Sequence, residues 1–189
     1  MKIVFATNNL NKIKEVQKAL PNVELVSLKS IGCTEELAEE QETLKGNAQK
    51  KAEYVFNKYK LPCFADDTGL IIDALDGAPG VYSARYAGED CDSEKNMDLV
   101  LKNLDGKVNR DARFKTVICL FTEFGPTFFD GVAEGEILLA RQGGEGFGYD
   151  PIFSPKGFDE SFAEMSIAQK NEISHRGLAV KKLIKKLEE

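Results

Sequence analysis

Hydrophobic positions in the chain form short apolar runs, which predict buried strands, separated by polar stretches with helical spacing. The first run, "KIVFA" at residues 2–6, is continuously apolar and predicts a strand buried on both faces. The next segment carries apolar residues at helical spacing, with Asn8 or Asn9 as candidate N-cap and Pro21 as its end. A strand that leads directly into a helix indicates an α/β protein.

The rest of the chain adds strands, hairpins and helices. An extended segment and an acidic loop precede a predicted helix over about 43–59, and "LPCFADDTGLIIDAL" reads as strand, sharp polar turn and strand. "DSEKNMDLVLKNL" predicts a helix with Asp92 or Ser93 as its cap. Alternating β-branched and aromatic residues over 112–139, broken at "EFGPT", predict a long antiparallel hairpin.

The last segments predict a short strand at "PIFSP", a short helix near 162–169 and a C-terminal helix opened by Ser174. This order predicts a mixed sheet with helices on its faces and a cleft between a parallel part and a hairpin lobe. With 189 residues, of which 42% are hydrophobic, the chain is long enough for one sizeable core, and we expect one domain over residues 1–189.

Composition excludes several classes of protein. The apolar runs are strand-sized and far shorter than the roughly 20 residues of a membrane helix, and the first residues form a strand instead of a leader, so the cytoplasm is expected. The four cysteines form no C-x-x-C pair, which disfavours zinc and disulfides and indicates reduced thiols, mostly in the core. A net charge of −6 argues against a general nucleic-acid binder.

The turn "TNNLNK" connects the first predicted strand to the first helix. Free backbone N–H groups and the helix dipole favour an anion at such a turn. Thr7 and Asn9 add neutral donors, and Lys12 adds a positive charge. A phosphate site and an ordinary capped helix with a solvated lysine both fit this segment, whereas the P-loop pattern G-x-x-x-x-G-K-[ST] is absent from the chain.

Adjacent carboxylates, Asp66 and Asp67, follow a buried run in "ADDTGL". Because successive side chains of a strand point in opposite directions, we expect only one of them to enter a cleft. That residue would hold Mg²⁺ or take a proton from water, although turn chemistry alone also explains the pattern. The acidic loop "EELAEEQE" offers a second metal carboxylate, from Glu39 or Glu42.

Two further groups of polar residues are candidates for ligand contacts. Asn47 and Lys51 share a stripe of the predicted helix 43–59 and are candidates for phosphate contacts, since asparagine inside a helix needs a reason. His175 and Arg176 fall in the first turn of the last helix, where the dipole disfavours positive charge unless an external anion or polar ligand is the partner.

The run "QGGEGFGYDPIF" places two aromatic rings and an acid behind several glycines. It is no dinucleotide fingerprint, because no strand and helix bracket it and Pro151 closes it. One interpretation is a tight turn with Phe147 and Tyr149 packed on the core. The other is an aromatic platform for a nucleobase, with Asp150 or nearby backbone groups reading the edge of the base.

Taken together, five stretches resemble the inosine triphosphate pyrophosphatase family, which acts on non-standard purine nucleoside triphosphates. They are "FATNNLNKIKE", "ETLKGNAQKKA", "FADDTGLIIDALDGAPGVYSARYAGED", "GFGYDPIF" and "KNEISHRGLA". They occur in register and cover almost the whole chain. The resemblance implies an elongated two-lobed α/β fold with a long mixed sheet, a central substrate cleft and a homodimer.

The resemblance also assigns roles to residues. Asp67 matches the catalytic acid and metal ligand, Thr68 a substrate contact beside it, and Glu39 the second metal carboxylate. This chain has "EEQETL" where the family usually reads "ETGxTF", which leaves Glu42 open as an alternative. Residues that match phosphate contacts are Thr7, Asn8, Asn9, Lys12 and Lys51. Residues that match contacts to the base are Phe147, Gly148, Tyr149, Asp150, Lys170, His175 and Arg176.

The implied reaction is Mg²⁺-dependent hydrolysis of ITP, dITP or XTP to the monophosphate and pyrophosphate, without a nucleic-acid or membrane partner. Three alternatives stay open. A pyrophosphatase of the related Maf-like kind would act on other nucleotides, and a nucleotide-binding sensor would keep the pocket without turnover. A thiol-dependent transferase would use His175 together with a cysteine.

Overall fold

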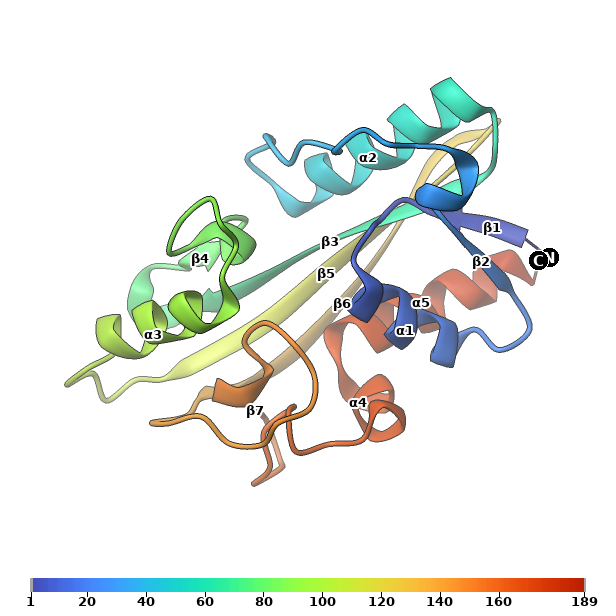
Figure 1. Cartoon of the computed structure of the whole chain (residues 1–189). Helices are drawn as coiled ribbons and strands as arrows, with labels where there is room; N and C mark the ends of the chain where they lie inside the picture. The colour runs from blue at the N-terminus through green and yellow to red at the C-terminus, as the bar shows by residue number, and fades with distance from the viewer. Residues whose placement is uncertain (1, 189) are drawn as a thin grey trace. The chain divides into compact units, whose positions relative to one another are not determined.

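The computed structural model describes residues 2–188 of the chain (Figure 1). Its α-helices are α1 (Leu10–Ala19), α2 (Leu44–Tyr59), α3 (Ser93–Asn103), α4 (Ile167–Ile173) and α5 (His175–Leu187). Its strands are β1 (Lys2–Phe5), β2 (Glu24–Ser27), β3 (Cys63–Ile72), β4 (Pro79–Gly80), β5 (Asp111–Thr122), β6 (Gly125–Ile137) and β7 (Phe153–Pro155). The expected α/β class is confirmed.

The strands form one mixed sheet in the order β2-β1-β3-β5-β6-β7, and β4 pairs with β3. β1 runs parallel to both neighbours, with Ile3 opposite Leu25 and Val4 opposite Cys63. β4 is antiparallel to β3, and β7 is antiparallel to β6. The mixed sheet predicted from the order of elements is therefore present.

The chain divides into two compact units. Unit 1 comprises residues 1–67, 116–131 and 175–189, and unit 2 comprises 68–115 and 132–174. β3, β5 and β6 each contribute residues to both units, because the division falls within these strands.

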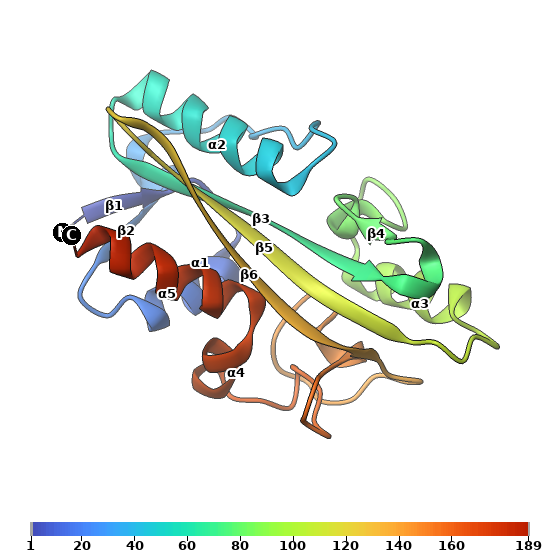
Figure 2. The same ribbon diagram turned by 180° about the vertical axis from the view of Figure 1, so that it is seen from behind.

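In unit 1, alternation along β1 explains how both faces of the sheet are covered. Ile3 and Phe5 pack with apolar residues of α1 and α5, whereas Val4 and Ala6 pack with α2. Successive side chains of a strand point to opposite faces, so the apolar run "IVFA" at residues 3–6 is buried on both. Figures 1 and 2 show α1 and α5 side by side, with α2 across the sheet from them.

Unit 2 has its own aromatic core. The rings of Phe114 of β5, Phe153 of β7 and Phe162 contact one another in edge-on, tilted and stacked arrangements, with centroids 4.7 to 6.1 Å apart. α3 covers this core through Met97 and Val100. The Asp92 side chain caps α3 by accepting hydrogen bonds from the backbone N–H groups of Glu94 and Lys95, which confirms Asp92 as the cap.

The sequence pattern also predicted the start of two other helices and the long hairpin. The Asn9 side chain caps α1, Thr43 caps α2, and the 112–139 hairpin is formed by β5 and β6. The described cysteines are free and three of them are buried, as expected. Burial raises the pKa of both Cys63 and Cys119 to about 12.

Two sequence predictions about elements were wrong. "ADDTGL" contains no turn, because β3 continues from Cys63 to Ile72 through both aspartates. The carboxylates are compatible with a buried strand since other side chains pair with them. The helix expected near 162–169 begins only at Ile167, where Ser166 forms a capping box with Gln169, while Phe162 is buried in the core of unit 2.

Among residues 2–188, no helix is both long and apolar enough to cross a membrane.

Close packing of β6 against α5 in unit 1 gives a first testable prediction. A Cβ atom added at Gly131 would lie 2.1 Å from the carbonyl oxygen of His175 and 2.7 Å from the backbone nitrogen of Ala179. Because both atoms belong to backbone, a Gly131→Ala variant must displace the start of α5. We expect it to lose at least ~1–3 kcal/mol of unfolding free energy, the usual cost of overpacking, in urea denaturation.

The matched control is Gly144→Ala, because a Cβ atom there meets nothing within 4 Å. The urea concentration at the midpoint of its unfolding should stay close to that of the unmodified protein. Equal midpoints for the two variants would contradict the close approach of β6 and α5.

Candidate functional site

A cluster of charged side chains in unit 1 contains many of the predicted site residues. Asp66 and Asp67 lie on β3, where the parallel part of the sheet ends, and cations approach from α1, α2 and α5. Its charged and amide side chains belong to Lys12, Glu15, Glu39, Asn47, Lys51, Asp66, Asp67 and Arg176.

Asp66 forms the buried centre of this cluster. Its Oδ1 accepts a hydrogen bond from Lys12 Nζ at 2.9 Å, and its Oδ2 accepts one from Arg176 Nε at 3.1 Å. Burial alone would raise the pKa of Asp66, but the charges of Lys12, Arg176 and Lys51 outweigh it and hold that pKa far below the usual range. Asp66 is therefore an ionised structural acid.

Arg176 is held by carboxylates on two elements. Its Nη1 donates to Glu15 Oε2 at 2.6 Å, and its side chain is only 3% exposed. Burial would lower the pKa of Arg176, but Asp66 and Glu15 raise it above its ordinary value. Internal carboxylates of the same unit thus offset the helix-dipole conflict noted at Arg176, which the dipole argument did not foresee.

Lys12 is not the solvated lysine of the capped-helix interpretation. Its side chain is 15% exposed, and burial lowers the pKa of its ammonium group despite the neighbouring Asp66 carboxylate. Lys51 and Arg176 lower it further. A cation in this position gains from any additional negative charge, such as a phosphate.

Asp67 faces a different set of partners, as expected for adjacent residues of one strand. Its Oδ2 accepts a hydrogen bond from Asn47 Nδ2 at 2.9 Å. Burial raises the pKa of Asp67 to about 6; Lys51 and the Asn47 bond oppose the rise, and Glu39 adds to it. This carboxylate is thus the one whose negative charge is least compensated.

Lys51 connects the acidic loop to β3. Its Nζ pairs with a Glu39 carboxylate oxygen and donates to the Asp66 carbonyl oxygen at 2.8 Å. Burial would lower the pKa of Lys51, but Glu39, Asp67 and Asp66 raise it. Of the alternative carboxylates, Glu39 belongs to this cluster, whereas Glu42 is exposed.

The cluster fits a divalent cation. Within it, three cations, Lys12, Lys51 and Arg176, face four carboxylates. Among residues 2–188, no three potential metal ligands of the His, Cys, Asp or Glu type form a ready cage. Asp67 and Glu39 would supply two hard oxygen donors, and Mg²⁺ usually takes one or two carboxylates and completes its shell with water and phosphate oxygens.

The turn ahead of α1 is already capped. Asn9 Oδ1 accepts from the backbone N–H groups of Asn11 and Lys12, and Thr7 Oγ1 accepts from the Asn9 backbone at 3.1 Å. Asn8 and Asn9 are exposed and Thr7 is half-buried. A phosphate at this turn would meet exposed polar groups in addition to the helix dipole.

In unit 2, the glycine-rich turn is organised around Asp150. Asp150 Oδ2 accepts from the Phe147 backbone N–H at 2.8 Å and from Lys170 Nζ at 2.6 Å. The Lys170 ammonium lies 5.1 Å from the centre of the half-buried Phe147 ring. Gly146 has φ +77°, and a Cβ atom there would lie 2.3 Å from Asp150 Oδ2, which explains why glycine precedes this turn.

The packing of Tyr149 bears out part of the tight-turn interpretation, and the nucleobase platform stays a prediction. Tyr149 is packed in the core of unit 2, and its hydroxyl donates to the Ser83 carbonyl oxygen at 2.7 Å. Phe147 and Gly148 remain half-buried. The tyrosine therefore holds the turn in place.

The structure also corrects one contact and adds residues that sequence reasoning missed. Asn47 was expected to contact phosphate, but it is fully buried and bonds to Asp67 and to the backbone of Gln41. Glu15 was not identified as a member of the cluster. The only sign of it in the sequence is its place in "KIKE" on the first helix. Ser161 was also missed; its buried hydroxyl donates to the Gln142 carbonyl oxygen at 2.7 Å and so ties down the start of the glycine-rich run.

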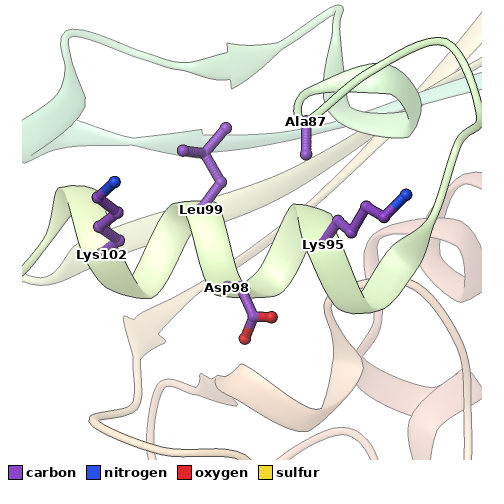
Figure 3. A pocket seen from close by; sticks show the side chains of 5 residues that line it. All are labelled: Ala87, Lys95, Asp98, Leu99 and Lys102. Atoms are coloured by element: carbon purple, nitrogen blue, oxygen red, sulfur yellow. The ribbon is translucent and has the colours of Figure 1, made fainter.

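A shallow cavity of about 320 Å³ lies on α3 and contains none of the predicted site residues. It is lined by Ala87, Lys95, Asp98, Leu99 and Lys102 (Figure 3). Lys95 and Asp98 already pair with Asp90 and Arg141. The charged clusters described above, and not this cavity, contain the candidate chemistry.

Comparisons with known proteins agree along the whole chain. The sequence model of the Ham1 family matches residues 3–186. A protein from Flavobacterium johnsoniae named dITP/XTP pyrophosphatase is 53% identical over 185 residues, covering 97% of this chain and 96% of its own. One of the same name from Porphyromonas gingivalis is 51% identical over 184 residues, covering 96% and 95%.

Solved structures give the same result for the fold. The Staphylococcus aureus Ham1 protein superposes with a TM-score of 0.90 at 36% identity, covering 100% of this chain and 98% of its own. A HAM1 protein from Coxiella burnetii gives a TM-score of 0.90 at 36% identity, covering 99% and 98%.

The raised pKa of Asp67 predicts a pH-dependent stability. The native carboxyl keeps its proton up to about pH 6, whereas the unfolded one releases it near the ordinary value of 3.8. Its contribution to stability is therefore full below pH 3.8 and is lost as the pH rises through 6. An Asp67→Asn variant should gain about 3 kcal/mol over the unmodified protein at pH 8, and this gain should vanish near pH 4.

Denaturation at several pH values with a metal chelator present measures this difference. Asp159→Asn makes the same change at an exposed position and is the control. An Asp67→Asn variant that is equally destabilised at pH 8 and pH 4 would contradict the burial argument.

Proposed function

Because the chain belongs to the Ham1 family, we propose that it hydrolyses non-standard purine nucleoside triphosphates to the monophosphate and pyrophosphate. The proposed substrates are dITP and XTP, which the names of its relatives contain, and ITP, which the sequence resemblance implies. The observation that carries the proposal is the buried Asp67 carboxylate with a pKa of about 6, adjacent to Glu39 and Lys51. Such a group is ionised at neutral pH yet basic enough to accept a proton.

We assign the phosphates to the charged cluster of unit 1. Lys12 and Lys51 would contact the triphosphate and stabilise the charge that develops on departing pyrophosphate. Thr7, Asn8 and Asn9 would bind it through the turn ahead of α1, and Thr68 would contact substrate beside Asp67. Asp66 and Glu15 would not touch substrate; they keep Lys12 and Arg176 in place.

We propose Mg²⁺ as the metal, held by Asp67 and Glu39. When bound, it would neutralise phosphate charge and offset the net negative charge of the cluster. Asp67 would position or deprotonate the water that attacks the α-phosphorus. The new bond joins the water oxygen to the α-phosphorus, and the bond to the bridging oxygen breaks, so that this oxygen leaves with pyrophosphate.

We assign stacking of the base to the aromatic turn of unit 2. Phe147 would stack on the purine, and Gly148, Tyr149 and Asp150 would form the turn around it. Lys170, His175 and Arg176 would recognise the 6-keto edge. A donor aimed at a 6-keto group is left unsatisfied by the 6-amino group of adenine, which disfavours ATP.

We further propose a homodimer that acts in the cytoplasm. The sequence resemblance implies the dimer, and the free cysteines among the described residues suit a reducing compartment.

Product analysis tests the proposal directly. The purified protein with Mg²⁺ should convert ITP, dITP and XTP to monophosphate and pyrophosphate far faster than ATP, GTP or dTTP. Chromatography should resolve these products from diphosphate and phosphate. In ¹⁸O-labelled water, the label should enter the monophosphate, and label in pyrophosphate would contradict attack at the α-phosphorus.

Other outcomes identify the alternatives. Preferential turnover of dTTP or ATP would favour a Maf-like activity. Persistence of bound triphosphate without turnover would favour a sensor.

A His175→Ala variant tests the base-reading assignment. Loss of a donor to the 6-keto oxygen should lower kcat/KM for ITP by roughly 10-fold or more while changing that for ATP little, so the ITP-to-ATP ratio narrows. Steady-state kinetics with both nucleotides measure this ratio. An unchanged ratio would remove His175 from base recognition.

A further inference from the structure

Asn47 of α2 links two parts of the charged cluster of unit 1. Its side chain is fully buried. Its Nδ2 donates to Asp67 Oδ2 at 2.9 Å, and its Oδ1 accepts from the Gln41 backbone N–H at 2.9 Å. One amide thus contacts both the carboxylate on β3 and the loop that precedes α2.

The chemistry of its partners fixes the orientation of this amide. An ionised carboxylate only accepts hydrogen bonds and a backbone N–H only donates, so a flipped Asn47 would lose both. Asparagine is also a poor helix former, and a buried amide is costly unless it is bonded. The position therefore favours asparagine because of the two groups that it connects.

The loop that carries Glu39 runs antiparallel along α2. Glu35 pairs with Lys58, Glu39 with Lys51 and Glu40 with Lys50, and Gln41 bonds to Asn47. Residue numbers rise along the loop as they fall along the helix. Two of these pairs, Glu35–Lys58 and Glu40–Lys50, are exposed and contribute little each. The Glu39–Lys51 pair and the Asn47–Gln41 bond are the part-buried attachments of this series, and Asn47 itself is fully buried.

We propose that Asn47 is a positioning residue that fixes the Asp67 carboxylate and the Glu39 loop relative to each other. The metal-binding part of this inference rests on the proposed function. Residues that orient metal ligands without touching the metal typically contribute 10- to 100-fold to metal affinity. Loss of the amide would remove one hydrogen bond from the Asp67 carboxylate and one from the loop at the same time.

The test compares Asn47→Ala with Asn57→Ala, a matched change at an exposed position of the same helix. Hydrogen exchange should show the Gln41 amide exchanging at least ~10-fold faster in Asn47→Ala, because its acceptor is gone. Electron paramagnetic resonance titration with Mn²⁺, without nucleotide, should give a dissociation constant about 10-fold higher. Asn57→Ala should match the unmodified protein in both measurements.

A second variant covers the case in which Asn47→Ala does not fold. Gln41→Pro removes the backbone donor at an exposed loop position and leaves the Asn47–Asp67 bond in place. It should weaken Mn²⁺ binding several-fold with little change in thermal stability. Unchanged Mn²⁺ binding in the folded Asn47→Ala variant, or in Gln41→Pro, would overturn the positioning role.

These readouts separate the two proposals. If both variants bind Mn²⁺ more weakly than the unmodified protein, but that protein hydrolyses none of the purine triphosphates, the proposed function fails and the positioning role of Asn47 stands. If hydrolysis proceeds but neither variant changes Mn²⁺ binding, the role of Asn47 fails and the proposed function stands.

Discussion

The ion pairs around Asp66 are the constraint on which the rest of unit 1 depends. Removing charges from water costs several kcal/mol each, and breaking one partner of a buried pair is more costly than replacing the whole pair by apolar residues. Here one carboxylate holds Lys12 from α1 and Arg176 from α5, and Arg176 also holds Glu15. Both helices are therefore fixed against β3 by charge as well as by the apolar contacts beneath them.

This arrangement separates two tasks between neighbouring aspartates. The positive charges around Asp66 outweigh the effect of its burial, and the resulting low pKa keeps this carboxylate ionised. At Asp67 the neighbouring positive charges do not outweigh burial, and burial together with Glu39 raises its pKa to about 6. The pleat of one uninterrupted strand produces this difference, since it directs adjacent side chains towards different partners. A turn at this position, as the sequence suggested, would not impose such a division.

Much of the architecture could be predicted because its signals are local. Helix caps such as Asn9 and Asp92 act within three residues, and the β5–β6 hairpin shows in its own alternation. The failures have a different origin. Arg176 and Asp66 are separated by 110 positions, so the dipole argument missed the internal partner. Segment 162–165 is apolar at helical spacing, yet the core of unit 2 takes up Phe162 and Met165 outside any helix.

The residues of the candidate site also divide into those that could be predicted from the sequence and those that depend on distant partners. Residue types and the resemblance located the acids and lysines, and the structure brings the unit 1 members among them together. What could not be read from the sequence was which polar groups are already satisfied by their neighbours. Tyr149 and Asn47 both looked like ligand contacts, but each is buried with its polar atoms engaged.

The buried thiols of unit 1 have a practical consequence. Cys63 on β3 and Cys119 on β5 have pKa values of about 12, so in the closed structure they are nearly inert to alkylating reagents. Each becomes reactive only when its strand leaves the core. The rate at which a maleimide reacts with these two thiols, relative to its rate with the exposed Cys91, would therefore measure how often the central strands open.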